Sequence, residues 1–286
     1  MALVTLKAIL DKAYAKGYAV GAFNVINLTF LEAIIQAARE TRSPVILNVA
    51  EVHFPFVTLE HIVPVVKRIT EEEAFDLALN LDHGLSMEAI QRAAKNGFTS
   101  IMFDGSALNF ADNVRQTCNV VKYCHEQGIS VEAELGAVGG AEGGALTGSA
   151  DPARFTDIGQ AREFAHATGV DALAVAIGNS HGRYKGPPQL DFDRLAAIRE
   201  ATGIPLVLHG GSGISAEDFR KAISLGIAKI NFFTGMSDEA IRTTKEYLHQ
   251  AGEKYNDYPM MINAVKDNVA KVVAEQMIIF GSAGQA

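Results

Sequence analysis

The sequence predicts an α/β protein: a single (β/α)₈ barrel, the TIM-barrel fold, over residues 1–286, with extra helices near the C-terminus. Short apolar runs alternate with amphipathic stretches along the chain, which favours parallel strands connected by helices over hairpins. There are eight such apolar runs, the number of strands in a closed barrel. The chain length also fits one barrel, which typically uses roughly 250 residues.

The individual elements follow from the apolar runs and the turn residues between them. The predicted strands are Ala19–Phe23, Pro44–Val49, Asp76–Leu81, Ser100–Phe103, Ser130–Leu135, Ala172–Ile177, Pro205–Leu208 and Lys229–Phe232. The predicted helices are Thr29–Glu40, Ser86–Asn96, Asn109–Gln127, Ile158–Thr168, Phe192–Thr202 and Ser215–Leu225. Ser86 and Ser215 stand at N-cap positions, and Gly97, Gly169 and Gly203 follow helices as C-caps do.

A doubly wound open sheet would produce a similar alternation, so the placement of polar residues decides between the two folds. Polar side chains fall at or just beyond the carboxyl ends of different predicted strands, where a barrel enzyme builds its site. They are Asp82, His83, Asp104, Glu132, Glu134, His181, His209 and Asn231.

Composition excludes several classes of protein. Hydrophobic residues make up 48% of the chain and charged residues 20%, which excludes a disordered or collagen-like chain. The net charge is -8 and no Lys/Arg block is present, so a nucleic-acid partner is not expected. No signal peptide and no membrane span are expected, and Cys118 and Cys124 lack a CxxC spacing. We therefore expect a reduced, cytoplasmic protein.

Three histidines follow three separate predicted strands: His83 in LDHG, His181 in GNSHG and His209 in LHGGSG. Neutral imidazoles suit Zn²⁺, and three protein ligands leave a coordination position open for substrate. A lone histidine near a strand end is more often a hydrogen-bonded structural residue. Three such residues on one rim favour a zinc site.

Several carboxylates stand near these histidines in the predicted fold. Asp82 directly precedes His83 and is either an acid/base group or a cap for the helix that begins near Ser86. Glu132 and Glu134 share one face of their strand, and buried carboxylates need partners. The partner is either a metal ion, the N–H of a ligand histidine or the cation of a structural salt bridge.

Two further segments suggest substrate binding. The Gly-rich stretch from Gly136 to Asp151 contains Glu142 and is either a mobile lid that carries this carboxylate over the site or a plain surface loop. HGGSG at 209–213 and NFFT at 231–234 each lie between a strand and a helix, where backbone amides bind phosphate.

The motifs LDHG, VEAELG with its Gly-rich segment, AIGNSHG, LVLHGGSGI and KINFFT together resemble the class II fructose-bisphosphate and tagatose-bisphosphate aldolases. The resemblance runs from GYAVGAFN at 17–24 to FGSAG near the C-terminus. In such enzymes cleavage of a carbon–carbon bond leaves charge on an enediolate, which zinc stabilises as a Lewis acid.

The resemblance implies roles for individual residues. His83, His181 and His209 would bind Zn²⁺, Asp82 would be the acid/base, and Glu142 would carry the proton at dihydroxyacetone phosphate. Dihydroxyacetone phosphate would be bound by Gly182, Gly210, Gly211, Ser212, Asn231, Phe232, Phe233 and Thr234. Glu134 and Asp104 would hold an alternative or second metal ion. The resemblance also implies a monovalent cation (Na⁺ or K⁺), sugar phosphate substrates, and a homodimer or homotetramer.

Several positions depart from the family pattern and are expected where the aldehyde half binds: Ala50, Asn80, Phe233, Gly235 and Lys266. Lysine at 266 is shared with tagatose-type members, so a substrate like tagatose 1,6-bisphosphate is expected. The alternatives are fructose 1,6-bisphosphate, a ketose 1-phosphate with an unphosphorylated aldehyde half, and a non-catalytic subunit of an aldolase complex.

Two residues are given no role. Lys229, the nearest candidate for a Schiff base, is expected at the start of its strand and away from the catalytic rim. His53 follows the second strand, but its position alone predicts no function.

Overall fold

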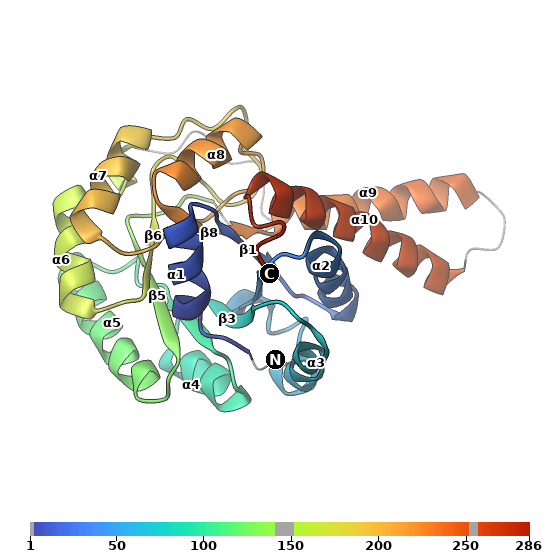
Figure 1. Cartoon of the computed structure of the whole chain (residues 1–286), viewed down its shortest axis with the longest axis horizontal. Helices are drawn as coiled ribbons and strands as arrows, with labels where there is room; N and C mark the ends of the chain where they lie inside the picture. The colour runs from blue at the N-terminus through green and yellow to red at the C-terminus, as the bar shows by residue number, and fades with distance from the viewer. Residues whose placement is uncertain (1–2, 141–151, 252–256) are drawn as a thin grey trace.

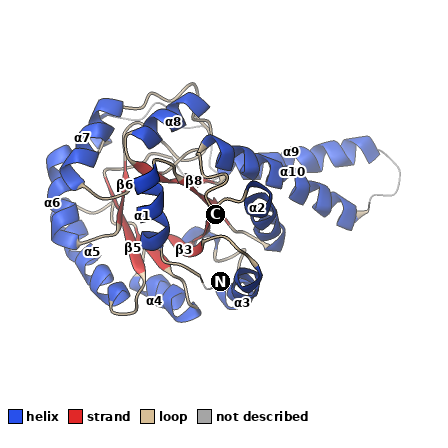
Figure 2. Cartoon of the chain, viewed as in Figure 1, coloured by secondary structure: helices blue, strands red, loops and turns tan. Residues whose placement is uncertain are grey.

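The computed structural model describes residues 3–140, 152–251 and 257–286. Eight parallel strands close into a barrel in sequence order, and helices connect consecutive strands around it (Figure 1). Figure 2 shows the strands at the centre of a ring of helices. The predicted (β/α)₈ fold is therefore confirmed.

The bounds of the elements are close to those predicted. The strands are β1 Val20–Asn24, β2 Val45–Ala50, β3 Leu77–Gly84, β4 Ser100–Phe103, β5 Ser130–Leu135, β6 Ala172–Val175, β7 Leu206–Leu208 and β8 Ile227–Phe232. The helices are α1 Leu6–Lys16, α2 Leu28–Thr41, α3 Leu59–Glu72, α4 Met87–Asn96, α5 Phe110–His125, α6 Ile158–Thr168, α7 Phe192–Thr202, α8 Ala216–Ser224, α9 Thr234–Ala251 and α10 Tyr258–Ile279. Short 3₁₀ turns cover Glu51–His53 and Pro152–Arg154.

The helix caps form as the sequence predicts. The side chain of Ser86 accepts a hydrogen bond from the Ala89 amide, and Ser215 accepts one from the Asp218 amide. Gly97, Gly169 and Gly203 adopt left-handed conformations directly after their helices. These residues account for the accuracy of the predicted helix ends.

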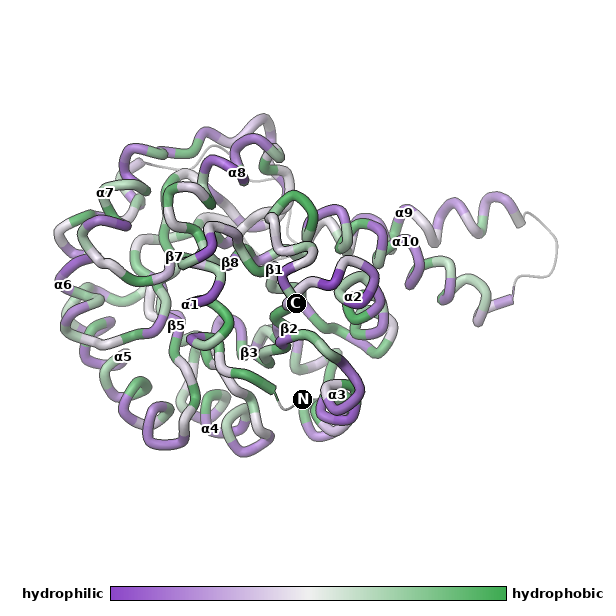
Figure 3. Tube along the Cα trace, viewed as in Figure 1, coloured by the Kyte–Doolittle hydropathy of each residue, from purple (hydrophilic) through white to green (hydrophobic). Residues whose placement is uncertain are grey.

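Apolar residues pack in two layers. One layer lies between the strands and the surrounding helices, and the other fills the amino-terminal half of the barrel interior. There α1 covers the barrel with Leu6, Ile9 and Leu10, all fully buried. Figure 3 shows helix turns around the ring that alternate between hydrophilic and hydrophobic, as helices covering a barrel do.

The carboxyl-terminal half of the barrel interior is polar. Residues two apart on one strand point to the same side. On the inner face of β1, Ala22 of the apolar layer is therefore followed by Asn24, and on the inner face of β3, Ala78 is followed by Asn80 and Asp82. This change from apolar to polar along several strands places the polar groups at the end of the barrel where the histidines lie.

The C-terminal helices α9 and α10 form an antiparallel hairpin that projects from the barrel (Figure 1). It carries exposed apolar side chains, among them Ile241, Leu248, Met260 and Ile278. Among the described residues no helix is long and apolar enough to cross a membrane.

Candidate active site

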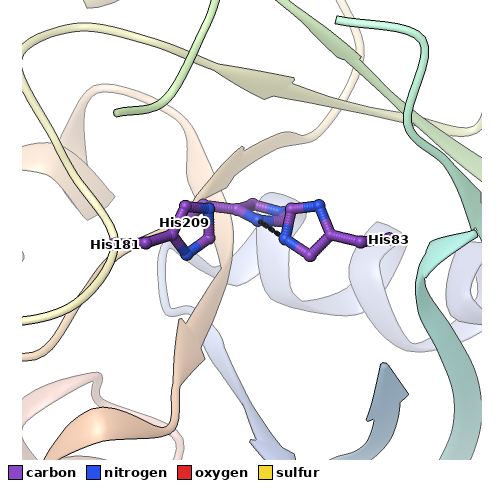
Figure 4. A group of neighbouring side chains, drawn as sticks. All are labelled: His83, His181 and His209. Atoms are coloured by element: carbon purple, nitrogen blue, oxygen red, sulfur yellow. Dashed lines mark hydrogen bonds between the residues drawn. The ribbon is translucent and has the colours of Figure 1, made fainter. Parts of the chain in front are cut away.

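The three predicted histidine ligands lie together at the carboxyl end of the barrel. His83 lies near the end of β3, His181 in the loop after β6, and His209 directly after β7. One ring nitrogen from each lies within 4.8 Å of those of the other two. Figure 4 shows the rings facing one another, with His83 and His209 joined by a close nitrogen–nitrogen contact. Residues from three distant parts of the chain thus meet in one cluster.

A bulge in β3 allows two consecutive residues to face the site. Leu81 pairs with Ile101 on β4 and Gly84 pairs with Phe103, so β3 has one more residue than β4 over this interval. His83 has a φ of 46°, in the left-handed region that non-glycine residues seldom adopt. The cap that we considered for Asp82 is wrong, because Ser86 caps α4 and Asp82 lies inside the barrel.

Carboxylates orient two of the histidine rings. Asp104 Oδ2 lies 2.8 Å from His83 Nδ1, and Glu132 Oε1 lies 3.0 Å from His209 Nε2. The remaining nitrogens, His83 Nε2 and His209 Nδ1, face each other at 3.1 Å. Ring nitrogens that converge while their opposite sides bind carboxylates are the arrangement of a metal site.

Burial keeps His181 and His209 neutral. It lowers the pKa of His181 to about 4, with His83 as a secondary cause, and it lowers the pKa of His209 well below the usual value. Neutral imidazole is the form that binds a metal. The chemistry of the donor set therefore fits Zn²⁺, with a coordination position left for substrate.

Lys229 lies inside the barrel, contrary to the expectation that it sits at the start of its strand. Strand β8 begins two residues earlier, at Ile227, and Lys229 is fully buried. Its Nζ donates to Glu132 Oε2 at 2.7 Å. Glu132 therefore serves both a lysine and a ligand histidine, and the ammonium group is held in an ion pair rather than left free as a nucleophile.

Asp82 is fully buried between two amide donors. Asn231 Nδ2 donates to one carboxylate oxygen at 2.9 Å and Asn24 Nδ2 to the other at 3.3 Å. Burial raises the pKa of Asp82, but the positive charges of His83 and Lys229 outweigh this effect and the net pKa is lowered. The group is thus held as a carboxylate beside the histidine cluster.

Asp104 and Glu134 form a second group of potential donors with His83, and their ligand atoms also lie within 4.8 Å of one another. Burial, together with the charge of Asp104, raises the pKa of Glu134 to about 8. Glu134 Oε2 is buried and has no hydrogen-bond partner among the described residues. Such a carboxylate fits a second or displaced ion.

Seven of the eight predicted phosphate-binding residues line one small pocket next to His181: Gly182, Gly210, Gly211, Ser212, Asn231, Phe233 and Thr234. Gly210 has a φ of 66°, and a Cβ there would lie 2.2 Å from the Ser180 carbonyl oxygen. The Gly235 amide, at the beginning of α9, donates to Ser212 Oγ at 2.9 Å. The pocket is thus built from tight turns and a helix N-terminus.

Phe232 is the exception, because its side chain does not line the pocket. Asn231 points inward from β8, so the next side chain points outward into the layer beneath the helices. The Phe232 ring packs there against Phe23, with ring centroids 6.3 Å apart. The position of this ring also explains why residue 235 is glycine, because a Cβ there would lie 2.4 Å from the Phe232 ring.

Asn80 does not lie where the aldehyde half was expected. Its amide donates to Asn48 Oδ1 at 3.0 Å and its oxygen accepts from Ser100 Oγ at 2.6 Å. All three side chains are fully buried below Asp82. Lys266 lies on α10, 3.8 Å from Asp267.

His53 lies next to Phe233, one of the pocket residues, although the sequence predicted no role for it. It is 7% exposed, and its ring lies against Phe233 with centroids 4.8 Å apart. Burial lowers its pKa, while the charge of Asp82 acts in the opposite direction. The only signal in the sequence was its position just after β2.

The Gly-rich segment is described at its beginning only. The His181 amide donates to the Gly139 carbonyl oxygen at 2.7 Å, which attaches the start of the segment to the histidine cluster. Glu142 lies outside the described residues, as does the rest of the segment up to Asp151.

Comparison with known proteins agrees with this geometry. Residues 4–285 match the family described as fructose-bisphosphate aldolase class-II. The chain belongs to the class II fructose-bisphosphate aldolase family. As a member of this family the protein is an aldolase, a carbon–carbon lyase that acts on sugar phosphates.

Full-length relatives support the assignment to this aldolase family. The chain is 42% identical over 289 residues to "Probable fructose-bisphosphate aldolase" of Bacillus subtilis (strain 168), covering 100% of both chains. It is also 42% identical over 289 residues to fructose-bisphosphate aldolase of Geobacillus stearothermophilus, covering 100% of this chain and 99% of that protein. The crystal structure of the YdjI aldolase from Escherichia coli K12 superposes with a TM-score of 0.88 at 36% identity, covering 99% of each chain.

Proposed function

We propose that this aldolase catalyses the reversible, zinc-dependent cleavage of a ketose phosphate such as tagatose 1,6-bisphosphate. The products would be dihydroxyacetone phosphate and an aldehyde such as glyceraldehyde 3-phosphate. One observation carries the proposal: the buried Asp82 carboxylate, held by Asn24 and Asn231, lies beside the converging nitrogens of His83 and His209. A carboxylate in this position supports the assignment of Asp82 as the proton acceptor next to the proposed zinc ligands.

Each group has a separate task in this proposal. His83, His181 and His209 hold zinc, which when bound stabilises the negative charge that develops on substrate oxygen as the carbon–carbon bond breaks. Asp82 accepts the proton of the substrate hydroxyl during cleavage and returns it during synthesis. Glu142 moves the proton at dihydroxyacetone phosphate. The pocket lined by Gly182, Gly210–Ser212, Asn231, Phe233 and Thr234 binds its phosphate, together with the backbone of Phe232.

Two other ions belong to the proposal. Glu134 and Asp104, with His83, form a donor set for an alternative or second metal position, which the unpaired Glu134 oxygen supports. A monovalent cation (Na⁺ or K⁺) near the phosphate would contribute positive charge there. Titration of zinc and of K⁺ into chelator-treated protein, followed by metal analysis, measures both stoichiometries.

A ketose 1-phosphate with an unphosphorylated aldehyde half is the second candidate substrate. The contact between His53 and Phe233 favours it, because this part of the site offers an imidazole and a phenyl ring. Fructose 1,6-bisphosphate is the substrate that the names of the two curated relatives suggest. The comparison of kcat/KM for these three substrates, with Lys266→Arg beside the parent, decides among them. A strong preference for fructose 1,6-bisphosphate would overturn the tagatose-like assignment.

A homodimer or homotetramer and a cytoplasmic location complete the proposal. The exposed apolar residues of the α9–α10 hairpin support self-association, since such a surface is costly to leave in water. Light scattering after size-exclusion chromatography measures the mass of the assembly. Free Cys118 and Cys124 are compatible with a reducing compartment.

A further inference from the structure

The loop after β2 is fixed in place at the mouth of the barrel. Glu51 accepts hydrogen bonds from the Leu85 amide at 2.7 Å and from Ser86 Oγ at 3.3 Å, which attaches this loop to the start of α4. Phe54, which directly follows His53, packs beneath the Arg92 guanidinium of α4. The position of His53, between these two anchors, is therefore defined by the fold.

His53 carries an unsatisfied polar atom. Its Nδ1 is buried and has no hydrogen-bond partner among the described residues. Buried polar atoms in native proteins almost always have a hydrogen-bond partner, so this nitrogen points to a group that binds there. The ring is otherwise packed against Phe233, a residue of the phosphate pocket.

The order of strands indicates which part of a substrate reaches His53. The phosphate pocket lies after β6, β7 and β8, whereas Asp82 lies on β3. In the barrel β1 lies between β8 and β2, so Phe233 after β8 and His53 after β2 meet over the end of β1. Ala50, three residues before His53, pairs with Asp82 across β2 and β3. His53 and Phe233 therefore lie between the phosphate pocket and Asp82, and the charge of Asp82 acts on His53.

We propose that His53 is a specificity-determining residue that hydrogen-bonds a hydroxyl group of the aldehyde half, while Phe233 packs against the carbon chain of that half. The inference rests on the proposed aldolase function and deepens it, because it favours the second candidate substrate, a ketose 1-phosphate with an unphosphorylated aldehyde half, over tagatose 1,6-bisphosphate. Neutral imidazole has one donor and one acceptor, which match a hydroxyl. A phosphate dianion placed against an imidazole and a phenyl ring would lose most of its hydration for a single hydrogen bond. The preferred aldehyde is therefore uncharged and bears a terminal hydroxyl.

The test runs the reaction in the direction of synthesis, with dihydroxyacetone phosphate and paired aldehydes. Glyceraldehyde and erythrose are each compared with the analogue that lacks the terminal hydroxyl, and glyceraldehyde is compared with glyceraldehyde 3-phosphate. The zinc-loaded parent should show a kcat/KM roughly tenfold or more higher for the hydroxylated member of at least one pair, and higher for glyceraldehyde than for its phosphate.

Variants then locate the effect. His53→Phe keeps the ring volume and should bring the ratio for the hydroxylated and deoxy aldehydes close to one, whereas His53→Gln should recover part of it. His61→Phe, at an exposed position on α3, is the matched control and should keep the parent ratio. An equal kcat/KM for both members of each pair in the parent, which needs no variant to fold, would overturn the inference. So would an unchanged ratio in His53→Phe.

Failure of the aldolase proposal itself has a different signature. Hydrogen–deuterium exchange at dihydroxyacetone phosphate, followed by NMR without any aldehyde, reports the first half of the reaction. Its absence in the zinc-loaded parent would contradict the proposed function. If exchange occurs but kcat/KM is equal for the hydroxylated and deoxy aldehydes, the proposed role of His53 is contradicted and the aldolase proposal is not.

Discussion

Lys229 Nζ lies 2.7 Å from Glu132 Oε2 in the barrel interior, and both side chains are fully buried. The other Glu132 oxygen contacts His209 Nε2 at 3.0 Å, so the ion pair fixes the orientation of a proposed zinc ligand. Glu132→Gln should weaken zinc binding roughly 10- to 100-fold, since it removes the charge that makes the ring a better donor. Competition with a chelator of known affinity measures this, and unchanged affinity would show that the pair is only structural.

Removal of Lys229 should affect stability more than chemistry. Lys229→Met leaves a buried carboxylate without its cation, which typically destabilises a protein by about 3–5 kcal/mol. The double variant with Glu132→Gln should recover much of this loss because the uncompensated charge is gone. Denaturant unfolding of the parent, the two single variants and the double variant provides the coupling energy. Additive losses would argue against the ion pair as the cause.

Asp82→Asn tests the proposed acid/base group. The amide keeps the shape of the carboxylate but cannot accept a proton, so cleavage should slow by roughly 10²- to 10⁴-fold. Zinc content should stay the same because Asp82 is not one of the three proposed zinc ligands, His83, His181 and His209. Asp11→Asn, on the exposed face of α1, is the matched control. Cleavage at the parent rate in Asp82→Asn would assign the proton transfer to another group.

Metal removal distinguishes the proposed zinc mechanism from a Schiff base. A strong chelator should abolish activity and zinc should restore it, whereas borohydride with substrate should have no effect, since Lys229 is held in an ion pair. His209→Ala should lose the bound zinc, and His166→Ala, at an exposed position on α6, should retain it. Inactivation by borohydride with substrate, together with full activity in the presence of chelator, would contradict the metal assignment.

The low pKa of His181 predicts how the metal-free protein responds to acid. Burial lowers this pKa from 6.5 to about 4, so the group stabilises the fold above pH 6.5 and this contribution is lost as the pH falls toward 4. Between pH 7 and pH 5 the loss from His181 should be about 2 kcal/mol. His181→Asn removes the titrating group. Between pH 7 and pH 5 the unfolding free energy of this variant should therefore fall by about 2 kcal/mol less than that of the parent. Parallel pH curves would mean that His181 keeps an ordinary pKa.

Glu142→Ala tests the residue that lies outside the described part of the chain. If Glu142 carries the proton at dihydroxyacetone phosphate, the variant should lose proton exchange by roughly 10²-fold or more and keep most of its affinity for that compound. NMR exchange and calorimetric binding measure the two quantities separately. Equal loss of both would mean that the segment only completes the pocket.

Most of the fold could be predicted because its signals are local. Apolar runs located the strands, and Ser86, Ser215 and the glycines after helices located the helix ends. Helix α3 was not among the helices named from the sequence, and it continues through Pro64. Helix α1 was missed as well, since its charged residues obscured the face with which Leu6, Ile9 and Leu10 cover the barrel.

The site was predictable where a residue's position along its strand determined its direction. The histidine cluster followed from three strand ends, and the outward direction of the Phe232 side chain follows from its place next to the inward-facing Asn231. The link between Lys229 and Glu132 and the contact between His53 and Phe233 depend on how distant strands meet. No pattern within either segment contains that information.

The bulge in β3 has a consequence for protein engineering. Asp82 and His83 are neighbours on one unusually shaped stretch of backbone, so the proposed base and the proposed zinc ligand cannot be repositioned independently. Replacing the zinc site with one for a larger or octahedral ion would shift residue 83 and displace the carboxylate with it. A designer who wants new metal chemistry in this barrel would do better to alter residues 181 and 209, whose neighbours along the chain carry no proposed proton-transfer role.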